Sequence, residues 1–97
     1  MYIKDIPKTV IADYCGVSID NEKEQVALLE IFAEAAKAFI KSETGLDDEG
    51  INKHEDLPVA FLVLTNEMYD KRDFTVDKTN LNPLVKQILA LHSVNYL

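Results

Sequence analysis

Residues 21–44 carry the feature that constrains the fold most, a long run of apolar side chains with the period of an α-helix. Between Val26 and Ile40 these side chains cover a broad arc, formed by Leu28, Leu29, Ile31, Phe32, Ala35, Ala36, Phe39 and Ile40. A single polar stripe lies opposite, made of Glu30, Glu34, Lys37 and Lys41. The alanines of this segment are strong helix formers, and their small size lets a second helix approach closely. The pattern predicts a helix that is covered by protein on every side except the polar stripe.

Both ends of this helix carry recognisable signals. Asp20 or Asn21 is expected to cap the first turn, because short polar side chains accept hydrogen bonds from free backbone amides. Glu22 and Glu24 add negative charge where the helix dipole favours it. The helix is expected to end just before Gly45, since glycine readily takes the left-handed conformation that closes a helix.

A third helix is predicted over residues 57–72. Asp56 is a candidate cap, and Pro58 falls in the first turn, where its missing N–H costs nothing. Residues 59–64 are apolar on all sides, so this helix is expected to be central in the fold or covered by a neighbouring subunit. Its polar far end, residues 66–73, must lie near the surface.

Two shorter helices complete the prediction. Residues 8–15 place three apolar side chains on one face before Gly16, and residues 83–93 follow Asn82, an expected N-cap, and start with Pro83. The chain is therefore expected to be all-α. It forms a single domain, a small bundle of four helices (about 8–15, 21–44, 57–72 and 83–93) with two exposed loops, at 46–56 and 74–80.

Charge and composition exclude several classes of protein. The 97 residues carry a net charge of −7, whereas a nucleic-acid reader needs a basic surface to displace counterions from phosphates. The single cysteine allows no internal disulfide, and the first residues lack the apolar stretch of a signal peptide. No apolar run approaches the roughly 18 residues that span a bilayer. We expect a soluble protein made in a reducing cytosol and not bound to a membrane.

The sequence offers no combination of residues that supports catalysis. It has no glycine-rich phosphate loop, and no histidine stands near Cys15, which is expected to fill space as a small, partly buried side chain. The acidic residues around Gly50 do not have calcium-loop spacing, so a solvated loop is expected there. His54 is interpreted as a surface residue because no second zinc ligand lies at the usual spacing. We expect no enzyme activity, cofactor or metal.

The segment 69–73 combines an aromatic side chain, an arginine and alternating charge, which are typical of protein–protein interfaces. A salt-bridged helix end explains the same residues equally well, and the sequence leaves both interpretations open. His92, near the end of the last helix, is expected to have a structural or interface role. The residues predicted to form an interface are Phe61, Leu64, Met68, Tyr69, Arg72, Asp73 and His92.

Three stretches, taken in order, resemble the gp6-like family of phage head–tail connector proteins, also called DNA-packaging or head-completion proteins. The first is TVIADYCGVSIDNEKEQVALLEIFAEAAKAFIKSETG, with its long alanine-rich helix that closes on a Thr-Gly pair. The second is LPVAFLVLTNEMYDKRD, and the third is the leucine-rich LNPLVKQILALHSVNYL. The chain departs from the family pattern at His92, where many members have an arginine near the end of the last helix, and at Lys71, which replaces a common asparagine.

The resemblance implies a non-catalytic subunit of a phage or prophage. Copies would form a homo-oligomeric, dodecameric ring below the portal protein, joined by tail-completion proteins, with DNA only as passing cargo. The protein would assemble in the host cytoplasm and end at the head–tail junction of the virion. An alternative is a small acidic helical adaptor or regulatory module that binds one protein partner.

Overall fold

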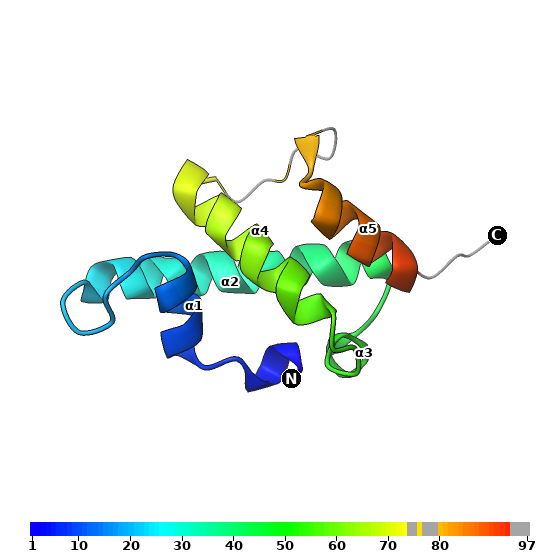
Figure 1. The fold of residues 1–97 in the computed structure, drawn as a ribbon, viewed down its shortest axis with the longest axis horizontal. Coiled ribbons are helices and arrows are strands. Elements are labelled where there is room, and N and C mark those ends of the chain that lie inside the picture. The colour runs from blue at the N-terminus through cyan, green and yellow to red at the C-terminus, as the bar shows by residue number, and fades with distance from the viewer. Residues whose placement is uncertain (74–75, 77–79, 94–97) are drawn as a thin grey trace.

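The computed structural model describes residues 1–73, 76 and 80–93. Within these ranges there is no strand, and the helical segments are η1 (Ile3–Asp5, a 3-10 turn), α1 (Lys8–Tyr14), α2 (Lys23–Thr44), α3 (Asp48–Ile51), α4 (Leu57–Lys71) and α5 (Pro83–His92). Helix α4 lies across α2, with η1 and α1 on one side of α4 and α5 on the other (Figure 1). The four longer helices confirm the all-α prediction, with ends within two residues of those expected. No described helix is both long and apolar enough to cross a membrane.

The core lies between α2 and α4. Phe32, Ala36 and Ile40 of α2 are buried together with Phe61 and Leu64 of α4, and α5 closes the cluster with Val85 and Leu89. Ala36 has no accessible surface, and its small side chain lets α4 approach α2 closely. Each buried phenylalanine or leucine contributes about 1.5–3 kcal/mol of transfer free energy.

The central position predicted for α4 is confirmed. Its apolar side chains are satisfied mainly within the chain, because η1, α1, α2 and α5 all pack against it. Val59 is the exception, since it is 45% exposed and is not covered by the chain itself. Leu62 and Val63 on neighbouring positions are half-buried.

The glycine and asparagine signals at helix ends are confirmed. Gly16 and Gly45 adopt left-handed conformations with φ of 73° and 75° just after α1 and α2. The Oδ1 atom of Asn82 accepts hydrogen bonds from the backbone amides of Leu84 (2.9 Å) and Val85 (3.4 Å) at the start of α5. The local sequence is enough to predict these helix ends, because each of the three residues acts on the backbone within a few positions of itself.

The expected cap of α2 is wrong. The helix begins at Lys23, after Glu22, and neither Asp20 nor Asn21 occupies the cap position. Glu22 instead turns back, and its carboxylate accepts a hydrogen bond from the backbone amide of Ser18 at 2.7 Å. This bond stabilises the turn that precedes α2, so the short polar side chains of the turn are not used as caps.

The prediction that α2 is covered everywhere except its polar stripe is also wrong. Ile31 is 55% exposed, and Ala27 and Ala38 on the same side of the helix are exposed as well. The shortest dimension of the molecule is 18 Å, which leaves room for two layers of helices about 10 Å across. Helices α4 and α5 cover one side of α2. Among the described residues, no third layer of helices covers the opposite side, where Ile31 lies.

The acidic segment 46–56, expected as a solvated loop, contains the one-turn helix α3. Asp47 caps it by accepting a hydrogen bond from the Gly50 amide at 2.7 Å, and Ile51 is only 1% exposed. Lys41 of α2 holds the segment from outside, with its Nζ atom 2.9 Å from Asp48 Oδ1. A single buried isoleucine gives no periodic signal, which is why the sequence did not reveal this helix. Most of the second predicted loop, 74–80, lies outside the described residues.

Candidate protein interfaces

The seven residues predicted as an interface do not form one surface. Phe61, Leu64 and Met68 are buried in the chain's own core and are at most 4% exposed. Arg72 and Asp73 are exposed after the end of α4, and Tyr69 and His92 are half-buried. The structure therefore separates the set into a core part and two clusters at opposite ends of α4.

The first cluster joins the end of α4 to the start of α2, and we name it the Gln25 cluster (Gln25, Phe32, Tyr69, Arg72). Tyr69 Oη and Arg72 Nη2 both donate hydrogen bonds to Gln25 Oε1, each 2.9 Å long. The Arg72 guanidinium lies 4.3 Å from the centre of the Tyr69 ring, a cation–π contact. Tyr69 in turn packs edge-on against Phe32, with ring centroids 6.3 Å apart. This geometry favours the helix-end interpretation, with hydrogen bonds to the Gln25 amide joining the end of α4 to α2.

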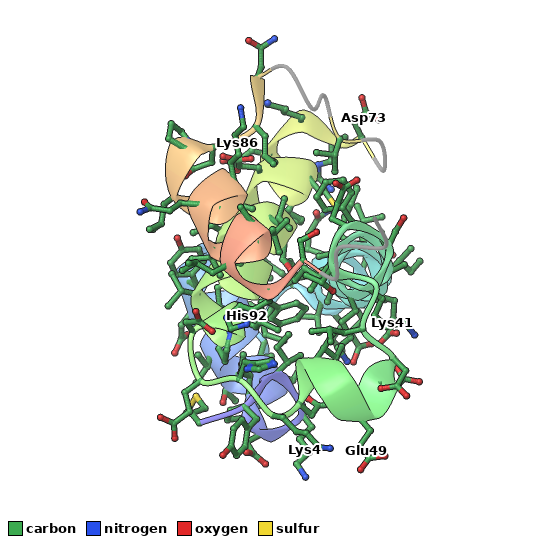
Figure 2. All side chains as sticks on the ribbon, turned by 90° about the vertical axis from the view of Figure 1, so that its right-hand side faces the viewer. Lys4, Lys41, Glu49, Asp73, Lys86 and His92 are labelled. Carbon is green, nitrogen blue, oxygen red and sulfur yellow. The ribbon has the colours of Figure 1, made fainter. Side chains whose placement is uncertain are left out.

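The second cluster joins the start of α4 to the end of α5, and we name it the Asp56 cluster (His54, Asp56, His92). The Nε2 atom of His92 lies 2.7 Å from both carboxylate oxygens of Asp56 (Figure 2 labels His92). The His54 ring packs against the His92 ring with centroids 4.1 Å apart and the ring planes tilted by 36°. Asp56 does stand at the cap position of α4, but its side chain makes no capping hydrogen bond, so that expectation is wrong.

The sequence missed the Asp56 cluster because Asp56 and His92 are 36 residues apart. His54, interpreted as a surface residue, is half-buried against His92. Among the described residues no group of three histidine, cysteine or acidic side chains can hold a metal ion. The two imidazole rings pack together, and the Asp56 carboxylate contacts the ring of His92. These contacts join the start of α4 to the end of α5.

Cys15 lies in a partly buried position near the end of α1. Burial raises the pKa of its thiol to about 11, and the carboxylate of Asp70 adds to the increase. A thiol with this pKa is almost wholly protonated at neutral pH, whereas a nucleophile must be a thiolate. The geometry fits the expected space-filling role.

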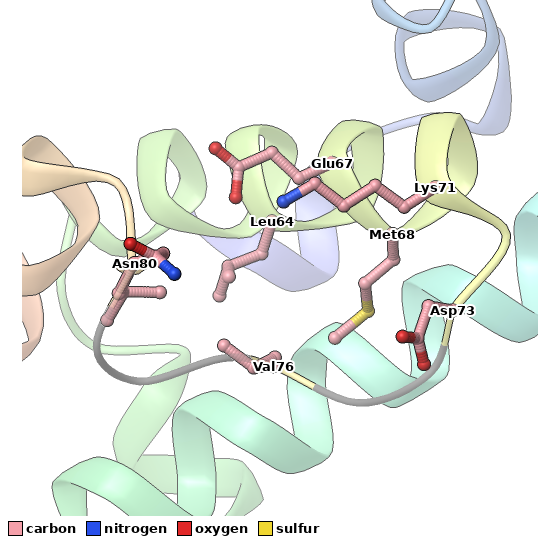
Figure 3. Close-up of a pocket in the computed structure, with 8 residues that line it drawn as sticks. Leu64, Glu67, Met68, Lys71, Asp73, Val76 and Asn80 are labelled. Carbon is pink, nitrogen blue, oxygen red and sulfur yellow. The ribbon is translucent and has the colours of Figure 1, made fainter.

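The hollow in Figure 3 lies beside the second half of α4. Leu64, Met68 and Val76 provide its apolar wall, and Glu67, Lys71 and Asp73 lie at its edge. Its volume is about 30 Å³, which is space for a water molecule and not for a ligand. The predicted interface residue Asp73 therefore lies at the edge of a hollow too small for a ligand and is itself exposed.

Exposed aliphatic side chains gather instead on α5. Leu84 is 48% exposed and Leu91 is 72% exposed, and their spacing of seven residues puts them on one side of the helix. We name Leu84, Gln87 and Leu91 the α5 ridge. Lys86, Ala90 and Ser93 lie on another side of α5, where they border a hollow shared with Glu43 of α2.

A second apolar surface is concave and lies between η1, α1 and α2. We name it the α1–α2 groove; its volume is about 350 Å³, and its floor is formed by Ile3, Ile6, Ile11, Ala33 and Phe61. Its rim consists of Lys4, Lys8, Glu30, Glu34 and Lys37. Lys8 pairs with Glu30 at 2.6 Å and Lys37 with Glu34 at 3.3 Å.

Comparisons of the chain with protein-family models, with curated proteins and with solved structures found no match. Among the described residues, Leu84 and Leu91 of the α5 ridge are left uncovered by the chain. The α1–α2 groove is a concave space above apolar side chains, most of which are almost fully buried.

Proposed function

We propose that the protein is a structural subunit of a phage or prophage head–tail connector. Copies form a ring, dodecameric as the family resemblance implies, that docks below the portal protein and receives the tail-completion proteins after DNA packaging. The subunit assembles in the host cytoplasm and works at the head–tail junction. It carries out no reaction.

The observation that carries this proposal is the exposed aliphatic surface of α4 and α5. Val59, Leu84 and Leu91 all retain between 45% and 72% of their accessible surface after the chain has built its own core. Leu84 and Leu91 lie on one side of α5, and exposed apolar surface of this kind is typical of a protein–protein contact site. Identical copies of one chain can cover such surfaces by contacting one another, as in most symmetric oligomers.

The charge of the chain supports the same proposal. A net charge of −7 repels DNA phosphates, so DNA can pass through a ring of such subunits without being retained. No described helix carries more than one lysine or arginine in excess of its acidic residues, whereas a helix that reads a DNA groove is basic. DNA is accordingly cargo in this proposal, and the binding partners are proteins.

The adaptor alternative shares the exposed surfaces but differs in stoichiometry. An adaptor binds one partner through one surface, whereas a ring subunit needs two different contacts with its own copies. Sedimentation velocity at increasing concentration, followed by negative-stain electron microscopy with and without the portal protein encoded by the same genome, separates them. Closed rings support the connector proposal.

A chain that stays monomeric both alone and with the portal overturns the connector proposal, and a one-to-one complex with a single partner then favours the adaptor. The neighbouring genes give an independent test. Genes for portal, capsid and tail-completion proteins are expected around this one, and their absence contradicts the proposal.

A further inference from the structure

We propose that the α5 ridge of one copy docks in the α1–α2 groove of the next copy. This inference rests on the proposed function for its partner, a second copy of the chain, and it names the two surfaces that meet. Each copy then uses its ridge towards one neighbour and its groove towards the other.

The two surfaces are complementary in shape. The ridge is convex, and it presents Leu84, Gln87 and Leu91 at helix positions i, i+3 and i+7, which is the spacing of anchors in helix-in-groove recognition. The groove is concave, and its volume of about 350 Å³ lies within the roughly 300–1,000 Å³ of ordinary binding clefts. Leucine side chains that lie exposed on the ridge would lose their contact with water on the apolar floor of the groove.

The two surfaces are also complementary in charge. The three lysines and two glutamates of the rim give the groove a net charge of +1 in a chain of net charge −7. Lys4 is the rim lysine that makes no ion pair with another described residue. At the Leu91 end of the ridge, His92 binds Asp56, whose carboxylate-bearing side chain remains 43% exposed. A ridge that enters the groove brings this acidic end towards the lysine rim.

The position of the two surfaces decides the type of contact. In Figure 1, η1 and α1 lie on one side of α4 and α5 lies on the other. A single copy therefore cannot bring its own ridge to its own groove. Two copies that use ridge and groove leave one unused surface at each end, so the contact repeats from copy to copy and closes into a ring or extends as a filament.

Cross-linking between cysteines tests the contact directly. In a Cys15→Ala background, Lys4→Cys marks the groove and Gln87→Cys marks the ridge, and a short bis-maleimide joins thiols that lie close together. The double variant is expected to give a ladder of covalent oligomers, whereas each single variant gives monomers. Ser42→Cys combined with Gln87→Cys is the matched control, because Ser42 is an exposed residue that borders neither surface.

Adding Leu91→Glu to the double variant should reduce the ladder at least about tenfold, since a buried anchor becomes a buried charge. Ala27→Glu, a change from an exposed apolar residue to an acid on α2, should leave it unchanged. Strong cross-linking of either single variant overturns the inference, because it indicates a two-fold contact. A double variant without a ladder overturns it too; if the unmodified chain still forms rings, the connector proposal survives, and if it does not, both fail.

Discussion

The two ends of α4 are held by different chemistry. At its C-terminal end, the Gln25 cluster combines a neutral amide, two hydrogen bonds of 2.9 Å and an aromatic pair packed edge to face. At its N-terminal end, the Asp56 cluster relies on a carboxylate and an imidazole whose side chains are 43% and 17% exposed. Packing therefore dominates one end, while a partly solvated polar contact dominates the other.

This difference determines how each end should respond to mutation and to salt. Packing energy depends on the volume of the side chain and is little affected by ionic strength. A charge-assisted hydrogen bond near the surface is weakened by solvent and screened by salt. Substitutions at the two ends should thus be separable by size of effect and by salt dependence.

The largest effect is expected for Tyr69→Ala. The change removes the contacts with Phe32 and Arg72 as well as the hydrogen bond to Gln25, and it should lower the free energy of unfolding by about 2–3 kcal/mol, because Tyr69 is only half-buried. Tyr69→Phe keeps the ring and should cost about 1 kcal/mol. Equilibrium unfolding in urea measures both, and equal losses in the two variants would show that packing contributes nothing.

Asp56→Asn should lower the free energy of unfolding by about 1 kcal/mol, since it removes the charge from the contact with His92 while the side chain remains partly exposed. This loss of stability should become smaller in 1 M salt, where charges are screened over about 3 Å. The loss for Tyr69→Ala should persist under the same conditions. Asp13→Asn, which removes the charge of an exposed carboxylate on α1, is the control. The same salt dependence at both ends of α4 would refute the contrast between them.

Arg72 allows backbone strain to be separated from side-chain contacts. It adopts a left-handed conformation with φ of 53°, which is costly for a residue with a Cβ atom. Both Arg72→Ala and Arg72→Gly lose the bond to Gln25, but only glycine relieves the backbone. The glycine variant should be more stable than the alanine variant by about 1 kcal/mol, as measured by thermal unfolding. An alanine variant as stable as the glycine variant would contradict this.

Near the same end of α4, Cys15 should react slowly. With a pKa of about 11, its thiol should be alkylated by iodoacetamide at pH 8.5 at least about tenfold more slowly than in the urea-unfolded chain. Asp70→Asn should increase the rate, because the carboxylate of Asp70 contributes to the raised pKa. The folded thiol binds its proton more tightly than the unfolded thiol, so its contribution to stability is present below pH 9.0 and is lost as the pH rises towards 11.

The smallest effect is expected for Lys41→Ala, which removes the ion pair between Lys41 and Asp48. The hydrogen bond and the charge of Lys41 lower the pKa of Asp48, so this ion pair contributes above the ordinary pKa of the carboxyl group and is lost as the pH falls. Lys41→Ala should raise that pKa in an NMR titration. Because Asp48 is fully exposed, the urea midpoint should not change measurably.

The sequence predicted what local signals determine. Gly45, Asn82 and the apolar period of residues 26–40 act within a few residues of themselves, so their consequences could be inferred without knowing the fold. The central place of α4 also followed from its composition. Residues whose effect is confined to their own helix account for the correctly predicted helices and helix ends.

The candidate sites depended on contacts that no local pattern contains. Gln25 meets Tyr69 and Arg72 across 44 and 47 residues, and Asp56 meets His92 across 36. Asp56 was expected to cap its own helix, but a distant imidazole accounts for its carboxylate. Likewise, the exposure of Ile31 follows from the number of helix layers, which the period of a single helix does not encode.

The anchoring of the acidic segment by Ile51 and Asp47 has a consequence for recognition. Fixing the backbone of a flexible residue costs about 1–2 kcal/mol. Asp48 and Glu49 lie within a capped helical turn and are therefore ordered before any partner arrives. A partner that complements their charges meets a rigid pattern and bears none of that ordering cost, so even a small contact here can add specificity.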